Sequence, residues 1–139
     1  MTAASDSDLD RYVRAVLGRK AQGVVVLDVA PLTSMAETFI IGSGRSNRQV
    51  TAIAEHVRSA LKERGIRPLN VEGLKDGHWV LMDYGHVIIH LFHEPLRSFY
   101  DLEGLWADAR HLRPPALAEQ ERAGTAEAGE ARPEELGDD

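Results

Sequence analysis

The chain has no cysteine, and this absence removes several kinds of chemistry at once. Without thiols there is no disulfide, no thiolate metal site and no cysteine nucleophile, and the composition fits a reducing cytosol. Long apolar runs are missing too, because no stretch approaches the ~20 residues of a membrane-spanning helix. The first ten residues are polar and acidic, unlike a secretory signal. We therefore expect a cytoplasmic protein with no membrane partner.

An excess of charge of either sign is also missing from most of the chain. Of the 139 residues, 16 are basic and 22 are acidic, which gives a net charge of −6. Eight of the acidic residues but only two arginines lie from Pro114 onward, so residues 1–113 carry 14 of each sign. Bulk charge therefore gives no argument for binding nucleic acid or membranes. Because Pro, Ala, Gly and Glu dominate after Pro114, we predict one folded domain over residues 1–113 and an acidic, disordered tail over residues 114–139.

Apolar spacing predicts an α/β domain with about five strands flanked by helices. The strand–helix–strand order around the second helix implies a parallel pair of strands with a right-handed crossover. In the last helix, which begins near Pro95, the inward side is expected to comprise Phe99, Leu102, Leu105 and Trp106. The predicted strands are residues 24–29, 38–42, 67–72, 79–83 and 86–92, and the other predicted helices are residues 5–17 and 46–64.

The last two strands should form a hairpin with Tyr84-Gly85 as its turn. One face would then be almost wholly aliphatic and belong to the core. The other face would mix aromatic, histidine and carboxylate side chains, and we look for function there. The expected pairs are Met82–Val87, Val80–Ile89 and His78–Leu91 on the aliphatic face, and Leu81–Ile88, Trp79–His90 and Asp83–His86 on the mixed face.

Four histidines in this region (His78, His86, His90 and His93) raise the question of a metal or an acid–base site. On a strand His90 and His93 point to opposite faces, and His86 and His90 are ~13 Å apart. We therefore expect no metal site. The Asp83–His86 pair has no nucleophile tied to it in the sequence, so we interpret it as structural or as part of an interface, with no catalytic residue.

The glycine-rich turn Gly42–Arg48 has two interpretations. A phosphate could lie against backbone N–H groups here, but the sequence matches neither GxxxxGK[ST] nor GxGxxG. Alternatively, Ser46 as N-cap and Gln49 three residues later form a capping box. A nucleotidyltransferase would also need two metal-binding carboxylates on the following strand, where Glu72 is the single acid.

Three segments together resemble the RsfS family of ribosomal silencing factors, also called Iojap-related proteins. They are LDVAPLTSMAETFIIGSGRSNRQVTAIAEHV, then PLNVEG, then HWVLMDYGHVIIHLFHEPLRSFYDLEGLW, and they extend over about Leu27–Trp106. The resemblance implies an α/β domain with a mixed sheet, distantly like nucleotidyltransferases but without their catalytic acids. It also implies a homodimer and a role without a cofactor.

The resemblance further implies binding to the large ribosomal subunit through large-subunit ribosomal protein fourteen. Proteins of this family occupy the face that joins the small subunit, block joining sterically and lower translation when nutrients are scarce. Organelle relatives are associated with assembly of the large subunit.

For this chain, we expect Trp79, Leu81 and Tyr84 to supply the desolvated centre of the partner-binding surface. Asp83 and Glu94 would meet lysines or arginines of the ribosomal protein. Three alternatives stay open: a helix that covers this face and makes Trp79 core, a nucleotide- or phosphate-binding enzyme using Gly42–Arg48, and a generic dimeric adaptor. Contact with ribosomal RNA through arginines is also left open, the candidates being Arg11, Arg14, Arg45 and Arg48.

Overall fold

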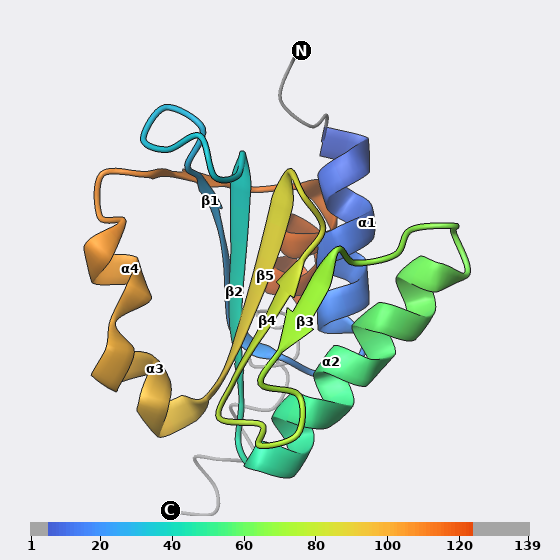
Figure 1. Cartoon of the computed structure of the whole chain (residues 1–139). Helices are drawn as coiled ribbons and strands as arrows, with labels where there is room; N and C mark the ends of the chain where they lie inside the picture. The colour runs from blue at the N-terminus through green and yellow to red at the C-terminus, as the bar shows by residue number, and fades with distance from the viewer. Residues whose placement is uncertain (1–5, 124–139) are drawn as a thin grey trace, which may run out of the picture.

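The computed structural model describes residues 6–123, so Ser5, the first residue of the helix predicted over residues 5–17, lies outside the described residues. Six strands form one mixed sheet in the order β3-β4-β5-β2-β1-β6 (Figure 1). No helix in the described residues is long and apolar enough to cross a membrane. The elements are α1 (Asp6–Leu17), β1 (Gln22–Asp28), β2 (Thr38–Gly44), α2 (Asn47–Lys62), β3 (Asn70–Glu72), β4 (Trp79–Asp83), β5 (Val87–His93), α3 (Glu94–Tyr100), α4 (Leu102–Leu105) and β6 (Arg110–Leu112), followed by a helix over residues 115–123.

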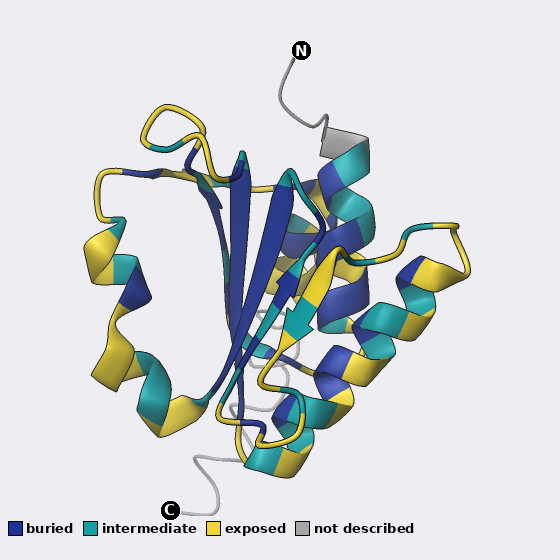
Figure 2. Cartoon of the chain, in the orientation of Figure 1, coloured by how far each residue is buried: buried dark blue, intermediate teal, exposed yellow. Residues whose placement is uncertain are grey.

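The centre of the sheet is the parallel pair β2 and β5, and every other pairing is antiparallel. Both central strands are buried along almost their whole length, as Figure 2 shows. We predicted that the strand after α2 would pair with β2, and this is wrong. That strand, β3, has only one apolar residue, Val71, and lies at the edge next to β4. The more apolar β5 takes the central place, because a strand covered on both faces must be apolar on both.

Two layers of helices enclose the sheet from opposite sides (Figure 1). On one side, which we call the α1/α2 face, the helices α1 and α2 pack on an aliphatic cluster that includes Val80, Met82 and Ile89. On the other side, the α3/α4 face, a smaller cluster contains Phe39, Phe92 and Leu102. The four inner strands β1, β2, β4 and β5 contribute alternate residues to the two clusters, as a period of two requires.

The hairpin of β4 and β5 exists, but its predicted register is wrong by two residues. Val80 faces Leu91 and Met82 faces Ile89, and the next link is a hydrogen bond of 2.8 Å from the Tyr84 N–H to the Val87 carbonyl. The turn is therefore Gly85-His86, with glycine in its first position at a φ of +92°. Because a shift of two residues preserves side-chain alternation, the predicted division into two faces is correct for the strand residues. His86 is an exception, because it lies in the turn and packs against Tyr12 of α1.

The single helix predicted after Pro95 is broken. Asp101 takes a left-handed conformation with a φ of +48°, which ends α3, and its carboxylate accepts a hydrogen bond from the Gly104 N–H at the start of α4. As a result Leu102 is buried and Trp106 is half-buried, but Phe99 and Leu105 are exposed, contrary to the prediction.

The chain is ordered further than predicted, because residues 115–123 form a helix where a disordered tail was expected. Ala116 and Leu117 join the cluster on the α1/α2 face. The Asp10 carboxylate accepts a hydrogen bond from the Ala116 N–H at 2.6 Å, and Arg14 pairs with Glu119 at 3.3 Å. The composition of this segment alone does not favour an ordered helix. Two buried side chains and these polar contacts to α1 stabilise it. The rest of the predicted tail, residues 124–139, lies outside the described residues.

Candidate partner-binding surface

The side chains of Trp79, Leu81 and Asp83 project from β4 toward the α3/α4 face. All three are half-buried, whereas Val80 and Met82 between them are fully buried on the α1/α2 face. Trp79 and Leu81 pack against the cluster of the α3/α4 face. The side chains that β4 directs toward the α3/α4 face are therefore neither fully buried in the core nor fully exposed to solvent.

Trp79 is surrounded by aromatic rings. Its ring stacks on Phe92 with centroids 4.9 Å apart and lies against Tyr100 at 4.9 Å. Its indole N–H donates a hydrogen bond of 3.2 Å to Nδ1 of His90. Tyr100, at the end of α3, therefore covers part of Trp79, and the tryptophan remains half-buried.

His90 is a buried polar group of this face, with only 4% of its surface exposed. Burial lowers its pKa to about 4, so the imidazole is neutral near pH 7. Its ring packs edge-on against Phe39 at 4.8 Å, and Phe39 meets Trp106 in the same way at 5.2 Å. His90 lies on the mixed face of the hairpin, as expected, but it is buried beneath Trp79.

Tyr84 is also buried, with 7% exposed, and it lies on the α1/α2 face. Its ring packs edge-on against Tyr12 with centroids 5.4 Å apart, and burial raises the pKa of Tyr84 to about 12. Since the true turn is Gly85-His86, Tyr84 keeps strand geometry and points the same way as Met82. The structure therefore does not place Tyr84 beside Trp79 and Leu81, as the predicted surface required.

The two predicted acidic residues lie at opposite ends of the hairpin. Asp83 is opposite Ile88, near the turn, and its carboxylate accepts a hydrogen bond of 2.8 Å from the Gly85 N–H. Glu94 is exposed and begins α3, six residues beyond Ile88, which is about 20 Å along a strand. The two carboxylates can therefore contact one partner only if its basic groups are widely spaced.

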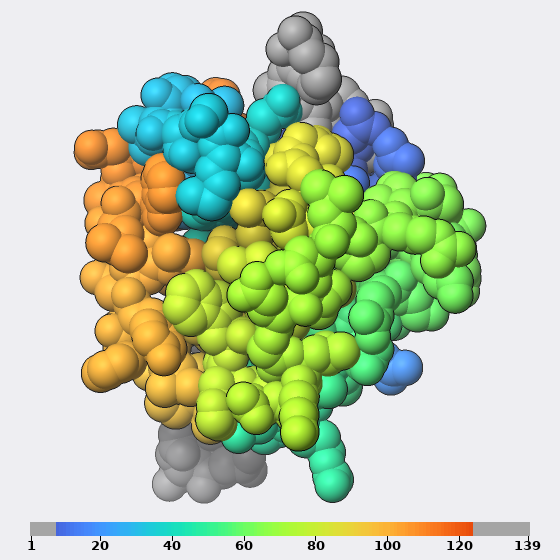
Figure 3. Space-filling view, in the orientation of Figure 1, coloured from blue at the N-terminus to red at the C-terminus, as the bar shows by residue number. Residues whose placement is uncertain are grey.

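Exposed apolar side chains occupy α3, α4 and the loop between β1 and β2. Phe99 and Leu105 are each 77% exposed on α3 and α4, and Leu32 and Met35 are exposed in the loop between β1 and β2. Figure 3 shows α3–α4 and this loop bordering the β4–β5 hairpin on one side of the molecule. Sequence periodicity assigned Phe99 and Leu105 to the core. Their exposure could not be predicted without knowledge of the break between α3 and α4 at Asp101. Neighbouring exposed apolar groups of this kind mark interaction sites.

The expected cross-strand pair of Asp83 and His86, interpreted from the sequence as structural or part of an interface, is not formed. The His86 ring packs against Tyr12 with centroids 5.7 Å apart, and Asp83 is opposite Ile88. Within residues 6–123, no three histidine or acidic side chains converge as a metal site would need. The register of the hairpin explains the separation, because Asp83 is paired with Ile88 and His86 lies in the turn.

The turn before α2 is arranged as a helix cap. The Ser46 hydroxyl accepts a hydrogen bond of 3.0 Å from the Gln49 N–H, and the Gln49 side-chain oxygen accepts one of 2.6 Å from the Arg45 N–H. Ser43 is buried, and its hydroxyl donates to the Gln22 carbonyl and accepts from Arg97. Two N–H groups that could hold a phosphate are thus already satisfied, which favours the capping interpretation.

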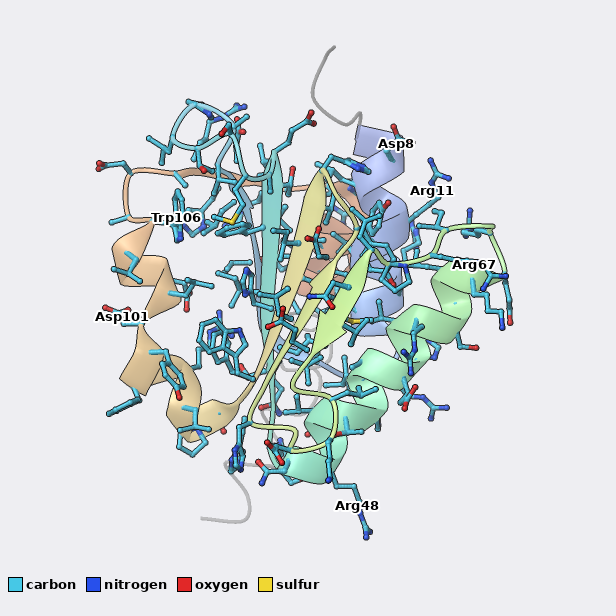
Figure 4. All side chains as sticks on the ribbon, viewed as in Figure 1. Asp8, Arg11, Arg48, Arg67, Asp101 and Trp106 are labelled. Carbon is cyan, nitrogen blue, oxygen red and sulfur yellow. The ribbon has the colours of Figure 1, made fainter. Side chains whose placement is uncertain are left out.

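Three of the arginines considered for RNA contact, Arg11, Arg14 and Arg48, lie away from the α3/α4 face. Arg11 and Arg14 on α1 form ion pairs with Asp8 and Asp10. Figure 4 shows Arg11 beside α1 and Arg48 at the start of α2, on the far side of the sheet from Trp106. Contact with RNA through these residues would therefore use a different surface from the one around Trp79.

A family model described as "Ribosomal silencing factor during starvation" matches residues 2–136. The chain belongs to the RsfS family. The ribosomal silencing factor RsfS of Halalkalibacterium halodurans is 41% identical over 101 residues, which are 73% of this chain and 86% of the relative. The mouse protein named mitochondrial assembly of ribosomal large subunit protein 1 is 30% identical over 71% of this chain and 45% of its own length.

The fold is that of solved RsfS-family structures as well. A crystal structure of a protein from Chromobacterium violaceum has a TM-score of 0.70 to this chain, at 37% identity, and the match covers 77% of this chain and 88% of that one. The α/β class and the mixed sheet flanked by helices, expected from the sequence, are confirmed, with six strands in place of about five.

Proposed function

We propose that this RsfS-family chain binds the large ribosomal subunit through its α3/α4 face and so blocks joining of the small subunit. The action is occupation of a surface and needs no bond chemistry. The observation that carries the proposal is the half-buried Trp79 on the same face as the exposed Phe99 of α3 and Leu105 of α4, in a member of a ribosomal silencing family. The mouse relative is named for assembly of the ribosomal large subunit, which supports the choice of subunit.

Charge on this side suits a basic partner. Residues 94–108 contain four carboxylates and one arginine, and that arginine, Arg97, is engaged by Glu103. Together with Asp83, these carboxylates make an acidic surface that complements the basic proteins bound to ribosomal RNA. We propose large-subunit ribosomal protein fourteen as the partner, with Trp79 and Leu81 at the centre and Asp83 and Glu94 toward the edges. The proposed site of action is the cytoplasm.

Sucrose-gradient sedimentation of purified subunits tests this proposal. An excess of the protein should reduce the joined-ribosome peak and co-sediment with the large subunit. Joining that is unchanged in the presence of excess protein would reject the proposal. A pull-down that recovers another partner and no large-subunit protein would favour the adaptor alternative.

Two leucines provide a matched pair of variants for the same gradient. Leu105 and Leu69 are 77% and 75% exposed, but Leu69 precedes β3 and lies outside the α3/α4 face. Leu105→Ala should weaken large-subunit binding by about five- to tenfold, and Leu69→Ala should leave it unchanged, because each loses a similar apolar side chain from a different surface. Equal effects of the two variants would show that the surface is wrongly placed.

A further inference from the structure

His90 lies where it can control the orientation of Trp79. It belongs to the central strand β5, opposite Leu81, and it reaches Trp79 diagonally across the hairpin. The stacking contacts with Phe92 and Tyr100 restrain the plane of the indole ring. They do not determine which edge of the ring points inward, whereas a hydrogen bond to one ring atom does.

The hydrogen bond also defines the state of the imidazole. An indole N–H can only donate, so Nδ1 of His90 must be the unprotonated acceptor and Nε2 carries the proton. The pKa of His90, lowered to about 4 by burial, keeps that acceptor available near neutral pH. The acceptor is therefore present throughout the physiological range.

The same histidine leaves a polar atom without a partner. Its Nε2 is buried and has no hydrogen-bond partner among the described residues. An unsatisfied buried donor costs stability, and an apolar side chain at this position would avoid that cost. Stability alone therefore does not account for a histidine here.

We infer that His90 is a positioning residue, which accepts the indole N–H of Trp79 so that the tryptophan presents its ring, and no donor, to the partner. This inference rests on the proposed function. The partner group that meets Trp79 is then an apolar side chain, or a lysine or arginine stacked on the ring, rather than a hydrogen-bond acceptor.

Two substitutions test the hydrogen-bond acceptor of His90 separately from its aromatic ring. His90→Phe keeps an aromatic ring and removes the acceptor, whereas His90→Asn keeps an oxygen near the position of Nδ1. The first readout is the indole N–H signal of Trp79 in a ¹H–¹⁵N spectrum of the protein alone, assigned with Trp106→Phe because the chain has two tryptophans. His90→Phe should shift this signal toward that of a solvated indole and speed its exchange with water, and His90→Asn should preserve it.

The second readout is binding to purified large subunits. His90→Phe should weaken binding by about three- to tenfold, the range expected for one hydrogen bond, and His90→Asn should recover most of the loss. Thermal melting of each variant verifies that it is folded. If His90→Phe does not fold, exchange in the unaltered protein decides the matter: the Trp79 indole N–H should exchange more slowly than that of Trp106.

The outcomes separate this inference from the proposed function. An unchanged Trp79 signal in folded His90→Phe, or equally fast exchange of both indoles in the unaltered protein, would overturn the inference. So would a shifted signal with unchanged binding. Failure of the unaltered protein to bind the large subunit at all would instead reject the proposed function, and with it the role of Trp79 in docking.

Discussion

The two faces of the sheet are built from alternate residues of the same strands, yet one is closed and the other is half-open. On the α1/α2 face, Val80, Met82, Ile89 and Leu91 are completely buried. On the α3/α4 face, Trp79 and Leu81 keep part of their surface in solvent, and the covering helices expose Phe99 and Leu105. How completely each face is buried therefore depends on the helices that cover it rather than on the strands.

The lengths of the covering helices explain the difference. The helices α1 and α2 have 12 and 16 residues, which correspond to about 18 and 24 Å, whereas α3 and α4 have seven and four residues, about 10 and 6 Å. The αL residue Asp101 separates the two short helices and turns their apolar side chains in different directions. Two short helices separated by a break leave apolar surface exposed for a partner.

Adjacent residues of β4 should separate stability from binding. Met82→Ala removes a fully buried side chain from the α1/α2 face and should lower the free energy of unfolding by about 3 kcal/mol. Leu81→Ala, on the half-open face, should cost about 1 kcal/mol but weaken large-subunit binding more than Met82→Ala does. Urea unfolding and subunit binding of both variants provide the measurements. Equal losses of stability would remove the distinction between the faces.

Acid should destabilise the α3/α4 face through His90. Its pKa is lowered from 6.5 to about 4 in the folded protein, so between these values the unfolded chain binds the proton more strongly and stability falls as pH falls. The His90 contribution to this loss should approach about 3 kcal/mol near pH 4. Urea unfolding at pH 7, 5.5 and 4 measures it, with His90→Phe as the control that lacks this component. Identical pH profiles for the two proteins would contradict the prediction.

Arg97 attaches the short helices to the sheet. Its largely buried guanidinium binds both carboxylate oxygens of Glu103, at 2.9 and 3.1 Å, and donates to the Ser43 hydroxyl at 2.8 Å. Arg97→Ala should lower the free energy of unfolding by about 2 kcal/mol and speed amide exchange in α3 and α4. Arg110→Ala, which breaks an exposed pair with Asp28, should cost less than about 0.5 kcal/mol. Exchange rates in α3 and α4 that stay unchanged in Arg97→Ala would contradict this role.

The smallest expected effect on the free energy of unfolding concerns the helix caps on the two faces of the sheet. Ser46 caps α2 with its side chain, whereas His93, at the start of α3, makes no side-chain cap. Ser46→Ala should cost about 1 kcal/mol, Ser46→Asp should restore stability, and His93→Ala should have almost no effect, all measured by urea unfolding. If inorganic phosphate stabilised the parent protein but not Ser46→Ala, the phosphate-binding interpretation of Gly42–Arg48 would return.

Several elements could be predicted because local patterns determined them. The helical spacing of Leu9, Tyr12, Val13 and Val16 predicted α1, and the glycine and capping residues predicted the start of α2. The faces of the hairpin were correct although its register was not, since alternation survives an even shift. Of the candidate site, Trp79, Leu81 and Asp83 lie on one face as predicted. Tyr84 does not, because contact with Tyr12, 72 positions earlier in the chain, holds it in the core.

By itself, the sequence determined which residues could be core, where most helices and strands lie, and the family to which the chain belongs. These depend on side-chain periodicity and local caps, which act over a few residues. Only the tertiary structure decided that β5 and not β3 pairs with β2, that residues 115–123 fold back on α1, and that Phe99 and Leu105 are exposed beside Trp79. Those outcomes depend on contacts between distant segments. The most apolar strand takes the buried centre of the sheet. One left-handed residue, Asp101, interrupts the helix that would have covered the site.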